Sequence, residues 1–281
     1  MVSMDRVLLT DSGTGQSEAM LKVLMDIPLF QRSNITVLHV VPPQVTAEGM
    51  TRKWEEGGKL LARTMQSLQL DPMRSNAMLQ EGEPKDVVCR VAEELDTNLI
   101  IMGSRGLKRL QSILDNSVSQ YVFQLASCPM LLVKDDIYVK KIRKVLVTID
   151  PSEASQQALQ LALAMVRGIK GGKIILVHVN SDLKTIPNIE DTPADQDPLL
   201  IPAVKEAKRL GLKYQCEAPS GKPGRRIRQL ADDLDVDLIV MGSPDRRPSV
   251  AKALPDLDRL LGNSLSDYIR VQAPCPVLLV R

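Results

Sequence analysis

Leu99-Ile100-Ile101-Met102-Gly103-Ser104, a short apolar run that ends in Gly-Ser, reappears 139 residues later as Leu238-Ile239-Val240-Met241-Gly242-Ser243. The same interval carries other residues onto identical ones: Asp11 onto Asp150, Ala19 onto Ala158, His39 onto His178 and Pro84 onto Pro223. An interval kept over so long a stretch is the signature of internal duplication. We therefore expect two homologous domains, residues 1–138 and residues 139–281.

The repeat changes its spacing once. Ser117 matches Ser264, and Cys128-Pro129 matches Cys275-Pro276, but at an interval of 147 residues. The second copy therefore carries eight additional residues just after Gly242. The two copies are expected to differ in function at this loop.

Composition excludes several classes of protein. The 36 basic and 34 acidic side chains nearly balance, and aromatic residues make up only 2%, which argues against a nucleic-acid partner. No apolar run approaches the roughly 20 residues that span a membrane, and the first residues lack the pattern of a signal peptide. We expect a cytoplasmic protein whose four cysteines are reduced.

Short apolar runs alternate with amphipathic stretches in both halves. Strands are expected at residues 7–9, 35–41, 77–79, 99–102 and 130–133, and again at 144–149, 173–179, 212–216, 238–241 and 277–280. Helices are expected in the first half at 15–29, 47–69, 84–95 and 113–126. This alternation predicts an α/β fold in which each domain is a five-stranded, parallel, doubly wound sheet with helices on both faces. Residues 181–198 predict a mobile loop and a shorter second helix.

The last strand of each copy is apolar and would form an exposed edge if its domain stood alone. Such edges invite pairing with another strand. We expect the two last strands to pair, either as an intrachain pseudo-dimer or in a homodimer.

Ligands of an open parallel sheet bind beyond the carboxyl ends of its strands, where the strand order reverses. In the first copy, Thr10, Asp11 and Ser12 follow the first strand, and Met102-Gly103-Ser104-Arg105-Gly106 follow the fourth. Glycines let backbone amides approach phosphates, and serines at a helix start offer hydroxyls and amides to an anion. These segments predict a phosphate-bearing ligand.

The spacing of this loop resembles a known signature. Gly103, Gly106 and Asn116-Ser117 follow the pattern G-x-x-G, nine residues and G-S/T, which is typical of the universal stress protein family, except that Asn116 replaces a glycine. The endings Ser127–Val133 and Ala273–Val280 also resemble this family. The resemblance covers nearly the whole chain. It implies two tandem Rossmann-like domains of the adenine nucleotide alpha hydrolase-like type.

The resemblance further implies that the chain is a stress-response regulator that binds ATP, which Mg²⁺ can accompany, and acts on a protein partner. The nucleotide contacts that it implies in the first copy are Thr10, Asp11, Ser12, Val40, Val41, Met102, Gly103, Arg105, Gly106, Asn116, Ser117, Val118 and Ser119. The corresponding candidates in the second copy are Asp150, Gly242, Ser264 and Ser266. There Asp245 replaces the second glycine, so we expect the second copy to bind nucleotide weakly, differently or not at all.

Alternatives remain open at this point. Asp11 and Asp150 are also suited to cap helices, and the two histidines, each inside an apolar strand, are expected to be structural and to lie away from the site. The glycines of the loop could simply turn the chain. A slow ATP hydrolase and an interaction module with degenerate sites are the rival functions, although no organised catalytic set accompanies the loop.

Overall fold

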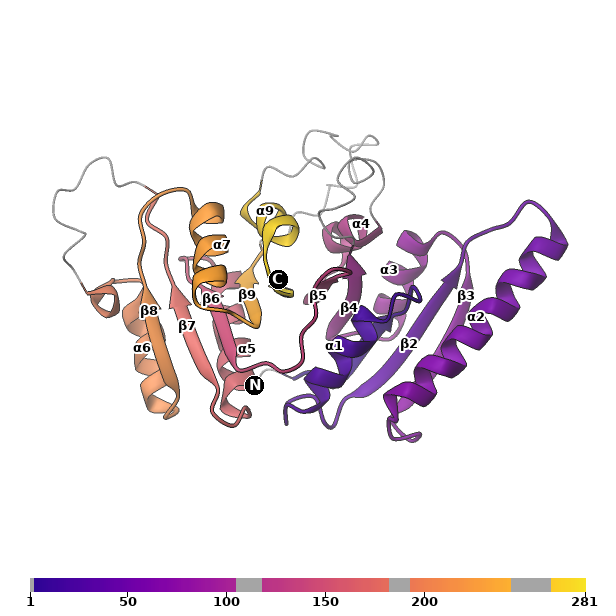
Figure 1. Ribbon diagram of the computed structural model, residues 1–281, viewed down its shortest axis with the longest axis horizontal. Coiled ribbons are helices and arrows are strands. Elements are labelled where there is room, and N and C mark those ends of the chain that lie inside the picture. Colours follow the sequence, from indigo (N-terminus) through magenta and orange to yellow (C-terminus); the bar gives the residue numbers. More distant parts are fainter. Residues whose placement is uncertain (1–2, 105–117, 182–192, 244–263) are drawn as a thin grey trace. The chain divides into compact units, whose positions relative to one another are not determined.

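The computed structural model describes residues 3–104, 118–181, 193–243 and 264–281. It divides the chain into two compact units, Ser3–Tyr138 and Val139–Arg281 (Figure 1). Strand and helix alternate in both units, so the predicted α/β class is confirmed. Within the described part of the chain, no helix combines the length and apolar character needed to cross a membrane.

The first unit contains five described strands and four described helices. They are β1 (Arg6–Thr10), α1 (Gln16–Met25), β2 (Asn34–Val41), α2 (Ala47–Leu68), β3 (Ser75–Glu81), α3 (Pro84–Glu94), β4 (Leu99–Ser104), α4 (Val118–Leu125) and β5 (Met130–Lys134). Pro84 occupies the first turn of α3, as expected for a residue without an amide hydrogen. The first helix ends at Met25 rather than near residue 29, because Pro28 disfavours helical backbone in the residue before it.

The second unit repeats this order in its described residues. Its elements are β6 (Lys144–Thr148), α5 (Glu153–Arg167), β7 (Lys173–Val177), the short 3₁₀ helix η2 (Ala194–Gln196), α6 (Leu200–Arg209), β8 (Lys213–Glu217), α7 (Pro223–Asp233), β9 (Leu238–Gly242), α9 (Leu265–Gln272) and β10 (Val277–Val280). Helix α6 has 10 residues against 22 in α2, so the shorter second helix is confirmed. The predicted loop falls mostly on residues 182–192, which lie outside the described residues.

Each unit builds one parallel sheet. The strand order is β3-β2-β1-β4-β5 in the first unit and β8-β7-β6-β9-β10 in the second, and every pairing inside a unit is parallel. The chain reverses its direction of winding between β1 and β4, which makes the carboxyl ends of these two strands the expected ligand position. The pairing of the two last strands with each other stays a prediction.

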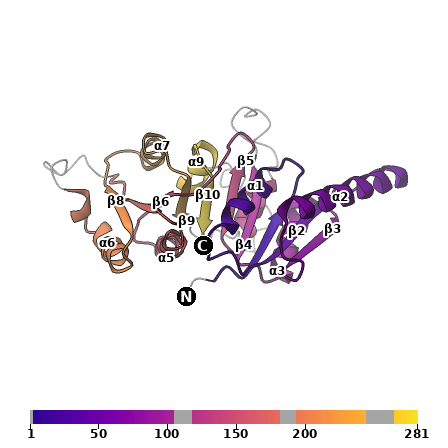
Figure 2. The same ribbon diagram turned by 60° about the horizontal axis from the view of Figure 1, so that its bottom comes forward.

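Helices cover both faces of each sheet. In the first unit α1 packs beside α2, and α3 packs beside α4 on the other face (Figure 1). Figure 2 shows the same layering in the second unit, where α5 and α6 lie on one side of the strands and α7 and α9 on the other. The central strands are fully covered, and Leu8, Ile100, Leu146 and Ile239 have no exposed surface.

The repeat interval is not the same in every strand. Strands β2 and β4 correspond to β7 and β9 at an interval of 139 residues, whereas β1 corresponds to β6 at an interval of 138. The strand register shows this shift. Arg6 pairs with Asn34 in the first unit, and Lys144 pairs with Lys173 in the second. The amide of Asp11 donates to Leu38, whereas the matching donor to Val177 is Ile149. The match of Asp11 with Asp150 is therefore wrong by one residue, since identical side chains concealed a one-residue shift. In position, the counterpart of Asp11 is Ile149.

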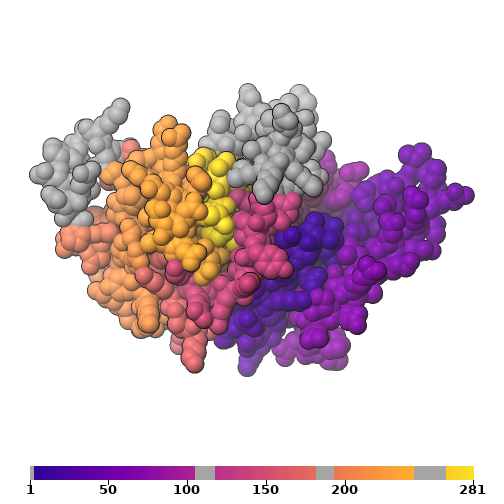
Figure 3. All heavy atoms as spheres, in the orientation of Figure 1, coloured from indigo at the N-terminus to yellow at the C-terminus, as the bar shows by residue number. Residues whose placement is uncertain are grey.

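Helix α2 approaches β2 closely at Gly57. A Cβ atom on Gly57 would lie 2.8 Å from Cδ2 of His39 and 2.9 Å from Cδ1 of Leu79, both shorter than normal contacts. The neighbouring Gly58 has open space around it. The amino-terminal part of α2 carries no buried residue before Gly57 and stands out from the surface of its unit (Figure 3).

The glycine that ends the fourth strand has a different environment in each copy. In the second unit a Cβ on Gly242 would lie 2.4 Å from the amide nitrogen of Ser155, in the first turn of α5. In the first unit the nearest described atom to a Cβ on Gly103 would be the Thr14 hydroxyl oxygen at 3.8 Å. Among the described residues, the space beside this glycine is therefore open in the first copy and occupied by backbone of α5 in the second.

Gly57→Ala and Gly58→Ala should change stability in opposite directions. Alanine favours a helix over glycine by about 1 kcal/mol, so Gly58→Ala should raise the free energy of unfolding by up to that amount. Gly57→Ala should lower it by about 1–2 kcal/mol, because the imidazole ring of His39 must move. Urea unfolding followed by circular dichroism measures both, and equal stabilisation by the two substitutions would contradict the close approach.

A second matched pair tests the difference between the copies. Gly242→Ala should destabilise the chain by about 3 kcal/mol or more, because a backbone atom cannot move aside as a side chain can. Gly103→Ala should change the free energy of unfolding by less than about 1 kcal/mol. Thermal and urea unfolding of the two variants give the comparison, which fails if Gly242→Ala is tolerated as well as Gly103→Ala.

Candidate functional site

A cavity of about 550 Å³ lies in the first unit at the carboxyl ends of β1 and β4. This volume is within the range of small-molecule sites, roughly 300–1,000 Å³. The described lining residues come from β1, β2 and the turns after these two strands, from β4, and from α2, α3 and α4. They are Thr10, Asp11, Ser12, Leu38, His39, Val40, Val41, Pro42, Gln44, Lys53, Glu56, Gly57, Leu60, Pro84, Val88, Met102, Gly103, Val118 and Ser119.

The cavity brings together most of the nucleotide contacts expected from the sequence. Those that line it are Thr10, Asp11, Ser12, Val40, Val41, Met102, Gly103, Val118 and Ser119. The other four, Arg105, Gly106, Asn116 and Ser117, lie outside the described residues. Their roles stay predictions.

Sequence reasoning missed the wall that α2 contributes. Lys53, Glu56, Gly57 and Leu60 all line the cavity from this helix. They recur at three- and four-residue steps, the spacing of one helix face, so the helical period together with the position of α2 was the available signal. The apolar wall from α3, at Pro84 and Val88, was missed as well.

The carboxylate of Asp11 is held firmly at one end of the cavity. The side chain is 5% exposed. Oδ1 accepts a 2.8 Å hydrogen bond from the amide of Gly13, and Oδ2 accepts a 2.5 Å hydrogen bond from the hydroxyl of Thr64 on α2. A carboxylate oxygen has more than one lone pair, so these two hydrogen bonds do not use up its capacity to accept.

The idea that Asp11 and Asp150 cap helices is wrong. The residue before α1 is Gly15, and α5 is capped by Ser152, whose hydroxyl accepts from the amide of Ser155. Asp150 instead accepts a 2.8 Å hydrogen bond from the amide of Ser152. Asp11 and Asp150 therefore close similar turns ahead of their helices, but Asp11 is buried in a cavity and Asp150 is exposed.

His39 is hydrogen-bonded, as expected, but it does not lie away from the site. Its Nδ1 is 2.7 Å from the carbonyl oxygen of Asp11, and the ring is half-buried in the cavity wall. The expectation failed because His39 stands two residues before the end of β2, and its side chain still reaches the cavity over the end of β1.

One ion pair lies at the cavity mouth. Lys53 and Glu56, one turn apart on α2, are 2.7 Å apart and both remain largely exposed. The hydrogen bond from Lys53 holds the pKa of the Glu56 carboxyl below its ordinary value, so this group is ionised at neutral pH. The pair places one cation and one anion beside the polar end of the cavity.

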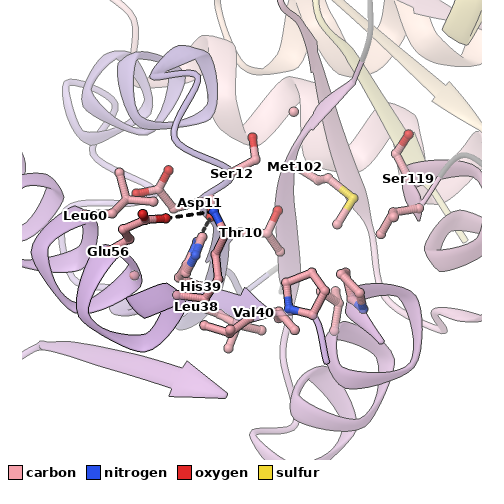
Figure 4. Close-up of a pocket in the computed structure, with 18 of the residues that line it drawn as sticks. Thr10, Asp11, Ser12, Leu38, His39, Val40, Glu56, Leu60, Met102 and Ser119 are labelled. Atoms are coloured by element: carbon pink, nitrogen blue, oxygen red, sulfur yellow. Dashed lines mark hydrogen bonds and ion pairs between the residues drawn. The ribbon is translucent and has the colours of Figure 1, made fainter. Parts of the chain in front are cut away.

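The two ends of the cavity differ in chemistry. Figure 4 shows Asp11, His39 and Glu56 gathered at one end, with Leu38 and Leu60 beside them, while Met102 and Ser119 lie at the other. The far end combines Gly103 with the first turn of α4, where Ser119 is buried. The positive partial charge at a helix start favours an anion there.

The second-copy candidates lie in a different setting. Ile149 takes the position of Asp11 and is 8% exposed, so no carboxylate follows β6 at that point. Gly242 is closed over by the first turn of α5, as described above. Asp150 and Gly242 therefore do not form the arrangement that Asp11 and Gly103 form.

The serines of the second copy are already paired within the protein. The Ser264 hydroxyl caps α9 by accepting from the amide of Asp267 and donates to the carboxylate of the same residue at 2.6 Å. The Ser266 hydroxyl lies 3.0 Å from Ser264 and accepts from Ser243 at 3.3 Å. Asp267 thus places a carboxylate at the start of α9, where the corresponding residue of α4 is the neutral Gln120.

The described residues hold no group of three or more metal-ligating side chains. Two of the cysteines, Cys89 and Cys216, have pKa values raised to about 11, chiefly by burial. Both thiols are therefore protonated at neutral pH, which makes them poor nucleophiles.

The comparisons agree with this architecture. The model of the universal stress protein family matches residues 4–134 and again residues 141–281. The universal stress protein YxiE of Bacillus subtilis (strain 168) is 25% identical over 146 residues, which are 46% of this chain and 99% of that protein. A crystal structure of a universal stress protein from Archaeoglobus fulgidus DSM 4304 covers 100% of this chain and 97% of its own, with a TM-score of 0.75 and 23% identity, which is a likeness of fold.

A universal stress protein solved in complex with cAMP also matches, at 26% identity over 50% of this chain and 96% of that chain. Its TM-score against the whole chain is 0.35, so the ligand is not carried over from it. The family match, by contrast, spans both halves and nearly all of the sequence. The chain belongs to the universal stress protein family and contains two tandem copies of its domain.

Proposed function

We propose that this chain is a nucleotide-responsive stress regulator that binds one ATP, accompanied by Mg²⁺, in its first copy. The single observation that carries the proposal is the cavity at the switch point of the first sheet. It has hydrogen-bond acceptors at one end, apolar walls, and a helix start with a serine at the other. A purine nucleotide has the matching order of polar base edge, flat apolar faces and anionic phosphates.

The cavity supports one orientation of the ligand. The base lies at the end formed by Asp11 and His39, with its faces against apolar side chains such as Leu38 and Val40. The phosphates lie toward Gly103 and the start of α4, because an anion is stabilised by helix amides and repelled by the carboxylates of Asp11 and Glu56. The expected contacts from Arg105, Gly106, Asn116 and Ser117 would complete the phosphate end.

Two features oppose nucleotide binding in the second copy. The turn that starts α5 occupies the space beside Gly242, where phosphate would approach. The carboxylate of Asp267 lies at the start of α9 and would repel phosphate at that helix start. We therefore infer that the second copy has a structural or partner-binding role.

Binding in the first copy would couple to the rest of that unit because the ligand touches separate elements. The cavity is lined by α2 on one side and by α3 and α4 on another. A ligand that bridges them stabilises the bound arrangement by about 2.7 kcal/mol when its concentration is 100 times Kd. Such a shift is large enough to alter association with a protein partner.

Isothermal titration calorimetry with ATP and Mg²⁺ should give one site per chain. Asp11→Ala should weaken binding at least about tenfold, because the base loses its carboxylate acceptor and the turn loses its hydrogen bonds to Gly13 and Thr64. The matched control is Asp150→Ala, which removes a similar turn in the second copy. It should leave the affinity unchanged.

A second pair tests the phosphate end. Ser119→Ala should weaken ATP binding severalfold, whereas Ser266→Ala, its counterpart in the repeat, should have no effect. Two equivalent sites per chain, or equal losses from the substitutions in both copies, would contradict the proposal.

A further inference from the structure

The orientation of the His39 ring is fixed by a group that can only accept a hydrogen bond. Nδ1 lies 2.7 Å from the backbone carbonyl oxygen of Asp11. A carbonyl has no hydrogen to donate, so Nδ1 must carry the proton. In the neutral imidazole the other nitrogen, Nε2, is then unprotonated and is an acceptor.

Nε2 of His39 is available to a ligand. The hydrogen bond to Asp11 is the one that the ring makes among the described residues. Nε2 is not a fully buried atom without a partner. Because the ring lines the cavity, Nε2 can be reached from the cavity. The absence of a side chain at Gly57 keeps this edge of the ring open, since a Cβ there would stand 3.3 Å from Nε2.

Two carboxylates, those of Asp11 and Glu56, lie beside His39 at this end of the cavity, and Lys53 is the one lysine or arginine among the described lining residues. The Asp11 carboxylate accepts hydrogen bonds from the amide of Gly13 and the hydroxyl of Thr64. The Glu56 carboxylate also accepts, and the nearby ammonium of Lys53 already donates to it. Apart from the Lys53 ammonium, which is held by Glu56, this end of the cavity presents lone pairs, and it fits a ligand edge that carries N–H groups.

We propose that His39 is a specificity-determining residue for the base, accepting a hydrogen bond at Nε2 from the exocyclic amino group of a 6-aminopurine. A 6-oxopurine presents a carbonyl oxygen at that position, which would face the lone pair of Nε2 without a hydrogen between them. The inference rests on the proposed nucleotide site and adds to it the residue that selects the base. The site is then expected to reject the 6-oxopurine, because Nε2 of His39 is left without a hydrogen bond.

His178, at the matching position of the second copy, is held in a different way. Its Nδ1 is 2.9 Å from the carboxylate of Asp197, which also accepts from the amides of Leu199 and Leu200. His178 therefore belongs to the start of α6 rather than to a cavity at the end of the first strand. It provides a matched control on the same chain.

The test compares ATP with ITP, which differ at position 6 of the purine, on the full chain by isothermal titration calorimetry. The wild type should bind ATP about tenfold more tightly than ITP. His39→Asn retains a donor near the position of Nδ1 but has no atom at Nε2, so ATP binding should weaken to within about twofold of ITP binding. His39→Gln can place an amide oxygen near the position of Nε2 and should recover part of the preference, and His178→Asn should preserve all of it.

The outcomes are distinguishable. If the wild type binds both nucleotides equally, or if His39→Asn keeps the full preference for ATP with unchanged affinity, the role of His39 is overturned while the nucleotide site stands. If the wild type binds neither nucleotide, the proposed function fails and the role of His39 fails with it. Circular dichroism and the urea midpoint of His39→Asn establish that a lost preference does not come from lost folding.

Discussion

A carboxylate buried at the end of a strand must be hydrogen-bonded, and the first copy is organised around satisfying Asp11. An unpaired charge in such a place would lower the free energy of unfolding by roughly several kcal/mol, which is comparable with the whole stability of a domain. The turn that bends back at Gly13, the hydroxyl of Thr64 on α2 and the packing of α2 against β2 at Gly57 all serve this arrangement. The same backbone that carries Asp11 orients His39, so one constraint fixes two acceptors of the cavity, the Asp11 carboxylate and the imidazole of His39.

The second copy shows what the fold becomes when that constraint is absent. Ile149 replaces the carboxylate, and no polar group there has to be satisfied. The first turn of α5 lies directly on Gly242, and the two serines at the start of α9 pair with one another and with Asp267. Duplication has therefore kept the scaffold of strands and helices, while the surroundings of the fourth-strand glycine differ between the two copies.

The sequence predicted the scaffold well because strands and helices follow hydrophobic periodicity. The five strands of each unit, the first-turn prolines and the family were all visible in the printed chain. The contribution of α2 to the cavity was not visible, because it depends on how a helix lies over the ends of strands distant in sequence. The match of Asp11 with Asp150 misled for a different reason: the residue types agree, and only the pairing of Arg6 with Asn34 and of Lys144 with Lys173 reveals the shift.

We propose that only the first copy holds the nucleotide, and two methionines at matching positions report on this directly. Met102 lines the cavity, and Met241 stands 139 residues later at the end of β9. In a spectrum of the chain labelled with ¹³C at its methionine methyl groups, and assigned with Met102→Leu and Met241→Leu, ATP should shift the Met102 resonance and leave that of Met241 in place. A shift at Met241 as large as that at Met102, or no shift at Met102 under saturating ATP, would contradict the account.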